Sequence, residues 1–290
     1  MNGHAVNTYP ANIPNLGLIT NDPTNVFQRD VIAGMHEIAS NSGYEVRIAT
    51  VTTRPGNLAA ITDATGLDFT RLNGVLIVAN VIPEPVLRQI WQTGVAISLV
   101  SHQSRSLAIP SVMPDNRQGI QMLMQHLVKD CGRRLPIFIQ GDPAQSDALL
   151  RENAFREELM RYNMPLSESR FIRGDFDPEV ATRATTRFLK IGQEFDSVLA
   201  ADFQMGLSAL NVLRNQNYRI PDEIAVVGFG DGPEAAAAGM TTVAADVVEL
   251  GRRAARQLIG QVKGLRIRGL TLLSTELLAR ETTHEAKMQP

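Results

Sequence analysis

The chain of 290 residues has a formal net charge of −2, and hydrophobic residues make up 44% of it. This length is enough for one large domain or two of moderate size, and the charge disfavours nucleic-acid binding through a general basic surface. Cys131 is the only cysteine, so an internal disulfide is excluded, which fits a reducing compartment.

The first 13 residues contain neither lysine nor arginine. A secretory signal needs a basic start before its apolar stretch, so these residues predict a disordered or extended leader instead. The longest apolar run, residues 74–82, is too short to span a bilayer. We therefore expect a cytoplasmic protein without a membrane segment.

Short, largely apolar runs recur along the chain and are typical of strands that are buried on both faces. They predict strands at 16–20, 45–51, 74–78, 96–100, 136–139, 197–201 and 224–228. Apolar residues at helical spacing between these runs predict helices at 27–41, 84–93, 118–129, 147–162, 178–190, 204–215 and 247–262. Such alternation indicates parallel sheets, whose ligands bind beyond the carboxyl ends of the strands.

The number of strand–helix units predicts two such sheets. The boundary is expected near residues 109–114, an extended segment that contains two prolines. Four apolar helix positions allow two interpretations, because they could form surface stripes in a dimer or face the sheet. These positions are Val31, Met35, Val86 and Ile90.

Three glycines, Gly228, Gly230 and Gly232, follow a predicted strand and raise the question of a dinucleotide-binding loop. That loop requires G-x-G-x-x-G at the first strand–helix turn, whereas this G-x-G-x-G spacing comes after at least six other strands. Asp231 would also repel a pyrophosphate. A carboxylate at a strand end instead suits the acceptance of hydrogen bonds from hydroxyl groups.

The segment RIPDEIAVVGFGD (219–231) closely resembles the V-P-D-D-I-A-V-V-G-F-D-D segment of LacI/GalR-family bacterial transcription regulators. The resemblance covers nearly all of residues 14–284, with further family-like motifs in the same order and at matching spacing. These are LGLITNDPTNVF (16–27), DN followed by HL (115–127), RENAFR (151–156), TTV followed by ELG (241–251) and LSTELLAR (273–280).

The resemblance implies an α/β fold of the periplasmic-binding-protein-like type I, with two doubly wound parallel-sheet lobes joined by three crossovers. The amino-terminal lobe would comprise residues 14–112 and 247–268. The carboxy-terminal lobe would comprise 113–246 and 269–284, followed by a tail at 285–290.

The resemblance also implies the ligand-sensing core of a transcriptional regulator, a homodimer that binds a small polar effector such as a sugar or nucleoside between its lobes. Family repressors bind operator DNA through a helix-turn-helix headpiece. The residues before the first strand are too few for one, so operator binding is expected only through a headpiece absent from this chain. The alternative is a sugar-binding protein of a transport system, which shares the fold.

Half of the ten candidate effector-binding residues fall in the amino-terminal lobe. Asp22, Asn25 and Phe27 follow the first strand and could offer hydrogen-bond acceptors and an apolar face, although Asp22 or Asn25 could instead cap the next helix. Ser101 and His102 follow the fourth strand, where the family commonly has Asp-Arg. His102 could equally be a solvated loop residue.

In the carboxy-terminal lobe, Arg151 matches the arginine with which the family contacts its effector, and a guanidinium can bridge two neighbouring oxygens. A surface ion pair with Glu152 or Glu157 is the alternative. Phe176 matches an aromatic residue that often stacks on the effector, with core packing as its alternative.

Three more candidates in that lobe are Asp202, Phe203 and Asp231. Asp202 stands where the family has an amide, and Phe203 where it has a carboxylate, while Asp231 keeps the second aspartate of F-D-D. With Asp22, the acidic residues facing one cleft would repel a phosphorylated effector. They favour a neutral polyhydroxylated one.

No catalytic set is evident. The five histidines and the single cysteine lack the spacing of a zinc site, and GLSAL (206–210) lacks the second glycine of a nucleophile elbow. We expect no enzyme activity, no metal and no cofactor.

Overall fold

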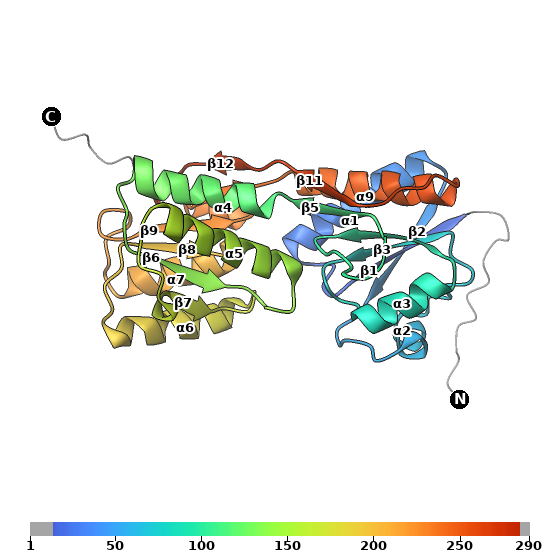
Figure 1. The fold of residues 1–290 in the computed structure, drawn as a ribbon, viewed down its shortest axis with the longest axis horizontal. Coiled ribbons are helices and arrows are strands. Elements are labelled where there is room, and N and C mark those ends of the chain that lie inside the picture. The colour runs from blue at the N-terminus through green and yellow to red at the C-terminus, as the bar shows by residue number, and fades with distance from the viewer. Residues whose placement is uncertain (1–13, 285–290) are drawn as a thin grey trace. The chain divides into compact units, whose positions relative to one another are not determined.

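The computed structural model describes residues 14–284, which fold as two compact units (Figure 1). One unit runs to Val112 and takes in Val247–Leu270, while the other contains Met113–Asp246 and the chain from Thr271. The chain therefore passes between the units three times. The leader expected at 1–13 and the tail expected at 285–290 lie outside the described residues.

The first unit is built on a six-stranded sheet in the order β11-β5-β4-β3-β1-β2. Helices α2 and α3 cover one face, where their apolar residues share a core with β1, β3 and β4, and α1 packs against α9, which contacts β3 and β4. The strands are β1 (Asn15–Thr20), β2 (Glu45–Thr50), β3 (Gly74–Val78), β4 (Ala96–Val100), β5 (Ser111–Pro114) and β11 (Leu270–Leu273), and the helices are α1 (Val26–Asn41), α2 (Leu58–Thr65), α3 (Glu84–Gln92) and α9 (Val247–Val262).

The second unit has a sheet in the order β12-β10-β9-β8-β6-β7, parallel except for the pairing of β12 with β10. Its strands are β6 (Pro136–Gln140), β7 (Phe171–Arg173), β8 (Ser197–Ala200), β9 (Ala225–Phe229), β10 (Thr241–Ala244) and β12 (Glu276–Leu278). Its helical segments are α4 (Asn116–Gln125), the π-helix η1 (His126–Asp130), α5 (Ser146–Arg161), the 3-10 turn η2 (Glu168–Arg170), α6 (Pro178–Ile191), α7 (Phe203–Asn215) and α8 (Pro233–Ala237).

The predicted fold class, two largely parallel α/β sheets, is confirmed, and each predicted strand and helix is present with ends shifted by a few residues. The helix α2 and the strands β5, β7, β10, β11 and β12 were not predicted from the sequence. These elements are only three to eight residues long. Such short runs carry too few residues to display a period, so tertiary pairing decides them.

The apolar residues with two interpretations face the interior of the first unit. Val31, Met35, Val86 and Ile90 are each at most 1% exposed, so they form no surface stripe. Among the described residues, none of the helices combines the length and the apolar character that crossing a bilayer requires.

Helices α1 and α9 approach each other closely at two glycines. A β-carbon on Gly34 would overlap the carbonyl oxygen of Val248, and one on Gly251 would overlap that of Val31. Close approach therefore depends on the missing side chain in each helix.

We expect Gly34→Ala to lower the free energy of unfolding by about 3 kcal/mol, because two helix backbones would have to separate. Gly56→Ala is the matched control, since no atom beyond its two chain neighbours lies within 4 Å of its β-carbon position. Its effect should stay within about 0.5 kcal/mol. Urea unfolding measures both, and equal values would contradict the close packing of α1 on α9.

Candidate functional site

The most highly organised polar group of the second unit surrounds Arg151 on α5. The guanidinium is buried, its Nε donates to Asn116 Oδ1 at 2.7 Å, and one terminal nitrogen donates to the carbonyl of Ala201 at 2.7 Å. The other terminal nitrogen lies 3.5 Å from Asp147 Oδ2, and the group lies 3.8 Å from the centre of the Phe229 ring. Arginine has five N–H donors, so these contacts leave two for a further partner.

The alternative surface ion pair of Arg151 is wrong. Glu152 pairs with Arg156 at 2.8 Å, and Glu157 contacts Arg117. The reason is helical geometry, because Glu152 adjoins Arg151 in sequence and points from a different side of α5, whereas Asp147 is four residues earlier and lies on the same side.

Asp147 and Asn116 were not among the predicted site residues, although Asn116 belongs to the family-like DN motif at 115–116. Asn116 Nδ2 donates to Asp147 Oδ1 at 2.7 Å while its own oxygen accepts from Arg151, so each fixes the other. Both residues are buried. The i, i+4 spacing of Asp147 and Arg151 was the signal that could have found the aspartate.

Asp202 follows β8 and caps α7, where its carboxylate accepts a hydrogen bond from the amide of Met205 at 2.8 Å. The residue is half-buried, yet enough protein surrounds the carboxylate that desolvation raises its pKa from the ordinary 3.8 to about 6. The Met205 amide and Arg151 act in the opposite direction. Arg151 thus interacts electrostatically with two acidic groups, Asp147 and Asp202.

Phe203 and Asp231 form a second group at the ends of β8 and β9. The buried Phe203 ring packs against Ala235 and Met240. A β-carbon on Gly232 would lie only 3.0 Å from this ring. Arg280 holds both carboxylate oxygens of Asp231, at 2.8 Å each. The glycines of this segment therefore make room for an aromatic ring.

Phe176 lies on a strained loop after β7. Asp175 and Phe176 have φ values of 57° and 58°, in the left-handed region that non-glycine residues seldom adopt. The half-buried ring covers Gly141, where a β-carbon would overlap it, and it also packs against the core of the unit. Strain of this kind persists only where the surrounding structure imposes it.

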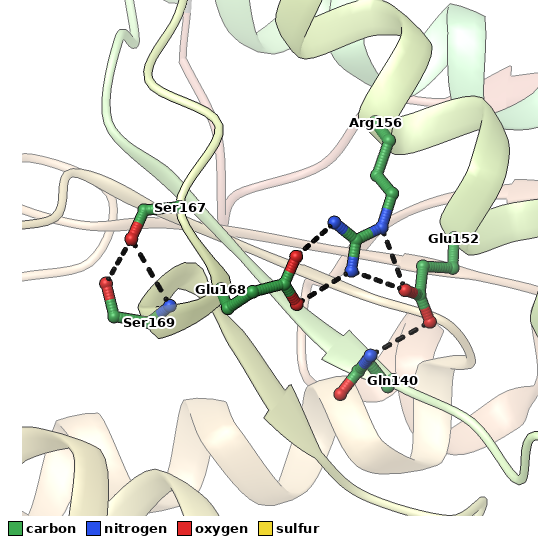
Figure 2. Close-up of polar contacts among 6 residues, drawn as sticks. All are labelled: Gln140, Glu152, Arg156, Ser167, Glu168 and Ser169. Atoms are coloured by element: carbon green, nitrogen blue, oxygen red, sulfur yellow. Dashed lines mark hydrogen bonds and ion pairs between the residues drawn. The ribbon is translucent and has the colours of Figure 1, made fainter.

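Gln140, which holds this loop, belongs to a hydrogen-bonded network with Glu152, Arg156 and Glu168 (Figure 2). The carbonyl of Gln140 accepts hydrogen bonds from the amides of Gly174 and Asp175, at 2.9 and 3.0 Å. The Gln140 side chain donates to Glu152 at 2.9 Å, and Glu152 and Glu168 both accept hydrogen bonds from Arg156. The network therefore links α5 and η2 to the end of β6, from which the loop is held.

In the first unit, the residues after β1 cap a helix and form a turn. Asn25 accepts from the amide of Phe27 at 3.0 Å, which makes it the N-cap of α1. Asp22 is exposed and accepts from the hydroxyl and the amide of Thr24, which lower its pKa. Phe27 is half-buried. The capping alternative thus describes Asn25, and effector contact by these residues stays a prediction.

Ser101 and His102 are buried rather than solvated, so the alternative interpretation of His102 is wrong. Desolvation lowers the pKa of the His102 imidazole, against the opposing effect of Glu84. Ser101 has a φ of 53° and donates its amide to the carbonyl of Val112 at 3.0 Å, which ties it to β5.

The structure thus brings Arg151 and Asp202 together, with Asp147, Asn116 and Phe229 around them. Phe203 adjoins Asp202 in sequence, whereas Phe176 lies on its own loop at the end of β7. Within residues 14–284, no group of three histidine, cysteine or acidic side chains is arranged to hold a metal ion.

Comparison with known proteins gives a consistent result. A family profile described as periplasmic binding protein-like domain matches residues 124–283. The HTH-type transcriptional regulator CelR of Thermobifida fusca is 28% identical over 273 residues, which cover 88% of this chain and 76% of CelR. The HTH-type transcriptional repressor CytR of Escherichia coli K12 is 23% identical over 269 residues, which cover 92% of this chain and 78% of CytR. These relatives are regulators, in agreement with the expectation that the chain is not an enzyme.

Two solved structures share the fold. A CelR–cellobiose complex has a TM-score of 0.77 and 24% identity, covering 92% of this chain and 84% of the other. A lac repressor dimer bound to operator and the anti-inducer ONPF has a TM-score of 0.81 and 20% identity, covering 94% and 95%.

Asp202→Asn should abolish a pH dependence of stability. The folded protein holds the Asp202 proton more tightly than the unfolded chain does. The protonated Asp202 therefore contributes fully to the free energy of unfolding of the wild type below about pH 4, and this contribution is lost as the pH rises through 6. Asparagine still caps a helix but does not titrate. Between pH 4 and pH 7, the difference in unfolding free energy should move by about 2–3 kcal/mol in favour of the variant, as measured by urea unfolding. A difference that is constant with pH would contradict the raised pKa.

Proposed function

Because the chain belongs to the periplasmic-binding-protein-like family and is the effector-binding core of a LacI-type transcriptional regulator, we propose that it senses a neutral, polyhydroxylated effector, a sugar or a nucleoside. The effector is bound at the carboxyl ends of β6, β8 and β9. The observation that carries this proposal is the buried Arg151, which is held by Asn116 and Ala201 and still has two N–H donors to offer.

Charge favours a neutral effector over a phosphorylated one. A single guanidinium lies near two acidic groups, Asp147 and Asp202, so a phosphate dianion would meet little net positive charge. Hydroxyl groups, by contrast, can donate to carboxylates and accept from arginine. The complex of the relative CelR with cellobiose supports a sugar as the first compound to test.

The effector would control DNA binding by shifting populations. A ligand that binds one conformation of the core better than another favours that conformation, and so changes the affinity of an attached headpiece for operator DNA. We propose a cytoplasmic homodimer, because the similar lac repressor is described as a dimer bound to operator. A solute-binding protein has the same fold, but the two relatives CelR and CytR are regulators.

A thermal-shift screen tests the effector class. It would contain cellobiose, pentoses, hexoses, polyols, nucleosides and purines, with NAD as the negative control. A compound at about 100 times its dissociation constant should stabilise the fold by about 2.7 kcal/mol. Stabilisation by a sugar or nucleoside supports the proposal, and stabilisation by NAD alone contradicts it.

Arg151→Lys should weaken binding of the most stabilising compound by about tenfold or more, because lysine keeps the charge but loses the planar fork and the stacking on Phe229. Arg117→Lys, which alters an exposed ion pair with Glu157, is the matched control and should bind as the wild type does. Lysine is preferred to alanine here because alanine would remove the buried positive charge that compensates Asp147. Calorimetry that gave equal affinities for the two variants would remove Arg151 from the site.

Phe176→Ala should weaken binding of pyranoses or nucleosides by about three- to tenfold, since an aromatic face packs against a ring. Binding of an acyclic polyol should change less. An equal loss for cyclic and acyclic compounds would indicate that Phe176 only supports the loop.

A further inference from the structure

The loop Gly230–Gly232 joins β9 to α8 and carries Asp231 at the edge where the proposed effector binds. Asp231 Oδ1 and Oδ2 each accept a hydrogen bond from Arg280 at 2.8 Å, and Oδ1 also accepts one from the Thr242 hydroxyl at 2.9 Å. The Asp231 side chain is 23% exposed and the Arg280 side chain 20%. A bidentate pair of this kind restricts both position and orientation.

Arg280 is itself fixed from several sides. It follows β12, and the terminal nitrogen that reaches Asp231 Oδ1 also donates to the carbonyl of Met240 at 2.7 Å. Its backbone amide donates to the Thr241 hydroxyl at 2.8 Å. The guanidinium therefore presents a rigid anchor to the loop rather than a mobile surface charge.

The anchored loop packs against the residue next to Asp202. β-Carbons on Gly230 and Gly232 would lie 3.4 and 3.0 Å from the ring of Phe203, so the glycine backbone lies against that ring. Phe203 is the first residue of α7, directly after the cap residue Asp202. A displacement of the loop would thus act on the helix end that holds the Asp202 carboxylate beside Arg151.

We propose that the Arg280–Asp231 pair is a positioning device that holds the loop Gly230–Gly232 against Phe203, and that Asp231 influences the effector through this contact rather than by touching it. The role in effector binding rests on the proposed function. The role in holding the loop does not. Both residues are positioning residues in this scheme, whereas Asp202 and Arg151 are among the residues that contact the effector.

The first experiment is amide hydrogen exchange of the full ligand-free chain. Arg280→Gln and Asp231→Asn should each accelerate exchange about tenfold in residues 229–240 and also in residues 202–207, at the amino-terminal end of α7. The double variant should exceed the stronger single variant by less than twofold, because the two changes break one interaction. Arg280→Lys keeps the charge and provides a milder variant if glutamine prevents folding.

Thr282→Val is the matched control. Thr282 anchors the same carboxy-terminal segment by donating to the carbonyl of Val226 at 2.6 Å and accepting from the amide of Thr241 at 2.8 Å, without contact to Asp231. It should accelerate exchange near β9 and β10 but not in residues 202–207. Unchanged exchange at 202–207 in both Arg280→Gln and Asp231→Asn, or equal acceleration there in Thr282→Val, overturns the proposal.

Binding of cellobiose, or of the most stabilising panel compound if cellobiose gives no shift, separates positioning from contact. Positioning predicts that Arg280→Gln and Asp231→Asn weaken binding by similar factors of about ten, without additivity. Wild-type affinity in Arg280→Gln together with loss in Asp231→Asn would show that Asp231 touches the compound. Failure of every compound to bind the wild type would count against the proposed function, while the exchange experiment still decides whether the pair holds the loop.

Discussion

Burial of the Arg151 guanidinium is the constraint around which the polar edge of the second unit is arranged. A buried cation must be hydrogen-bonded and electrostatically compensated, because its removal from water is costly. Asn116, Asp147 and the carbonyl of Ala201 accept hydrogen bonds from the guanidinium, and the Asp147 carboxylate also compensates its charge. Phe229 covers one side of the guanidinium. Since these partners lie on α4, α5 and β9 and directly after β8, the arrangement also fixes where those elements meet.

Hydrogen bonds and close packing also fix the other candidate residues at that edge. Asp202 is drawn to the helix end by its bond to the Met205 amide, but its surroundings make ionisation unfavourable. Phe203 fills the space over a glycine-rich loop that Arg280 ties down through Asp231. Phe176 is held over Gly141 by a backbone that Gln140 and its network constrain.

Sequence reasoning succeeded where a signal was local. The apolar runs predicted seven strands, and the helical spacing predicted seven helices, because burial on both faces of a sheet imposes continuous apolar strands. It failed for short elements such as β7 and β12, whose pairing is decided by neighbours far along the chain. The ion pair of Asp231 with Arg280 was not predicted, because nothing near residue 231 reveals a partner 49 residues later.

The sequence by itself determined the fold class, the family and the position of Arg151 on a helix of the second unit, since these depend on periodicity and on ordered motifs. Only the tertiary structure decided which charged groups are neutralised by which partners. Asp147 pairs with Arg151, Arg280 with Asp231, and Asn116 joins α4 to α5. The physical reason is that burial and hydrogen bonding depend on distances in space, and residues remote in sequence supply the partners that set the charge of the site.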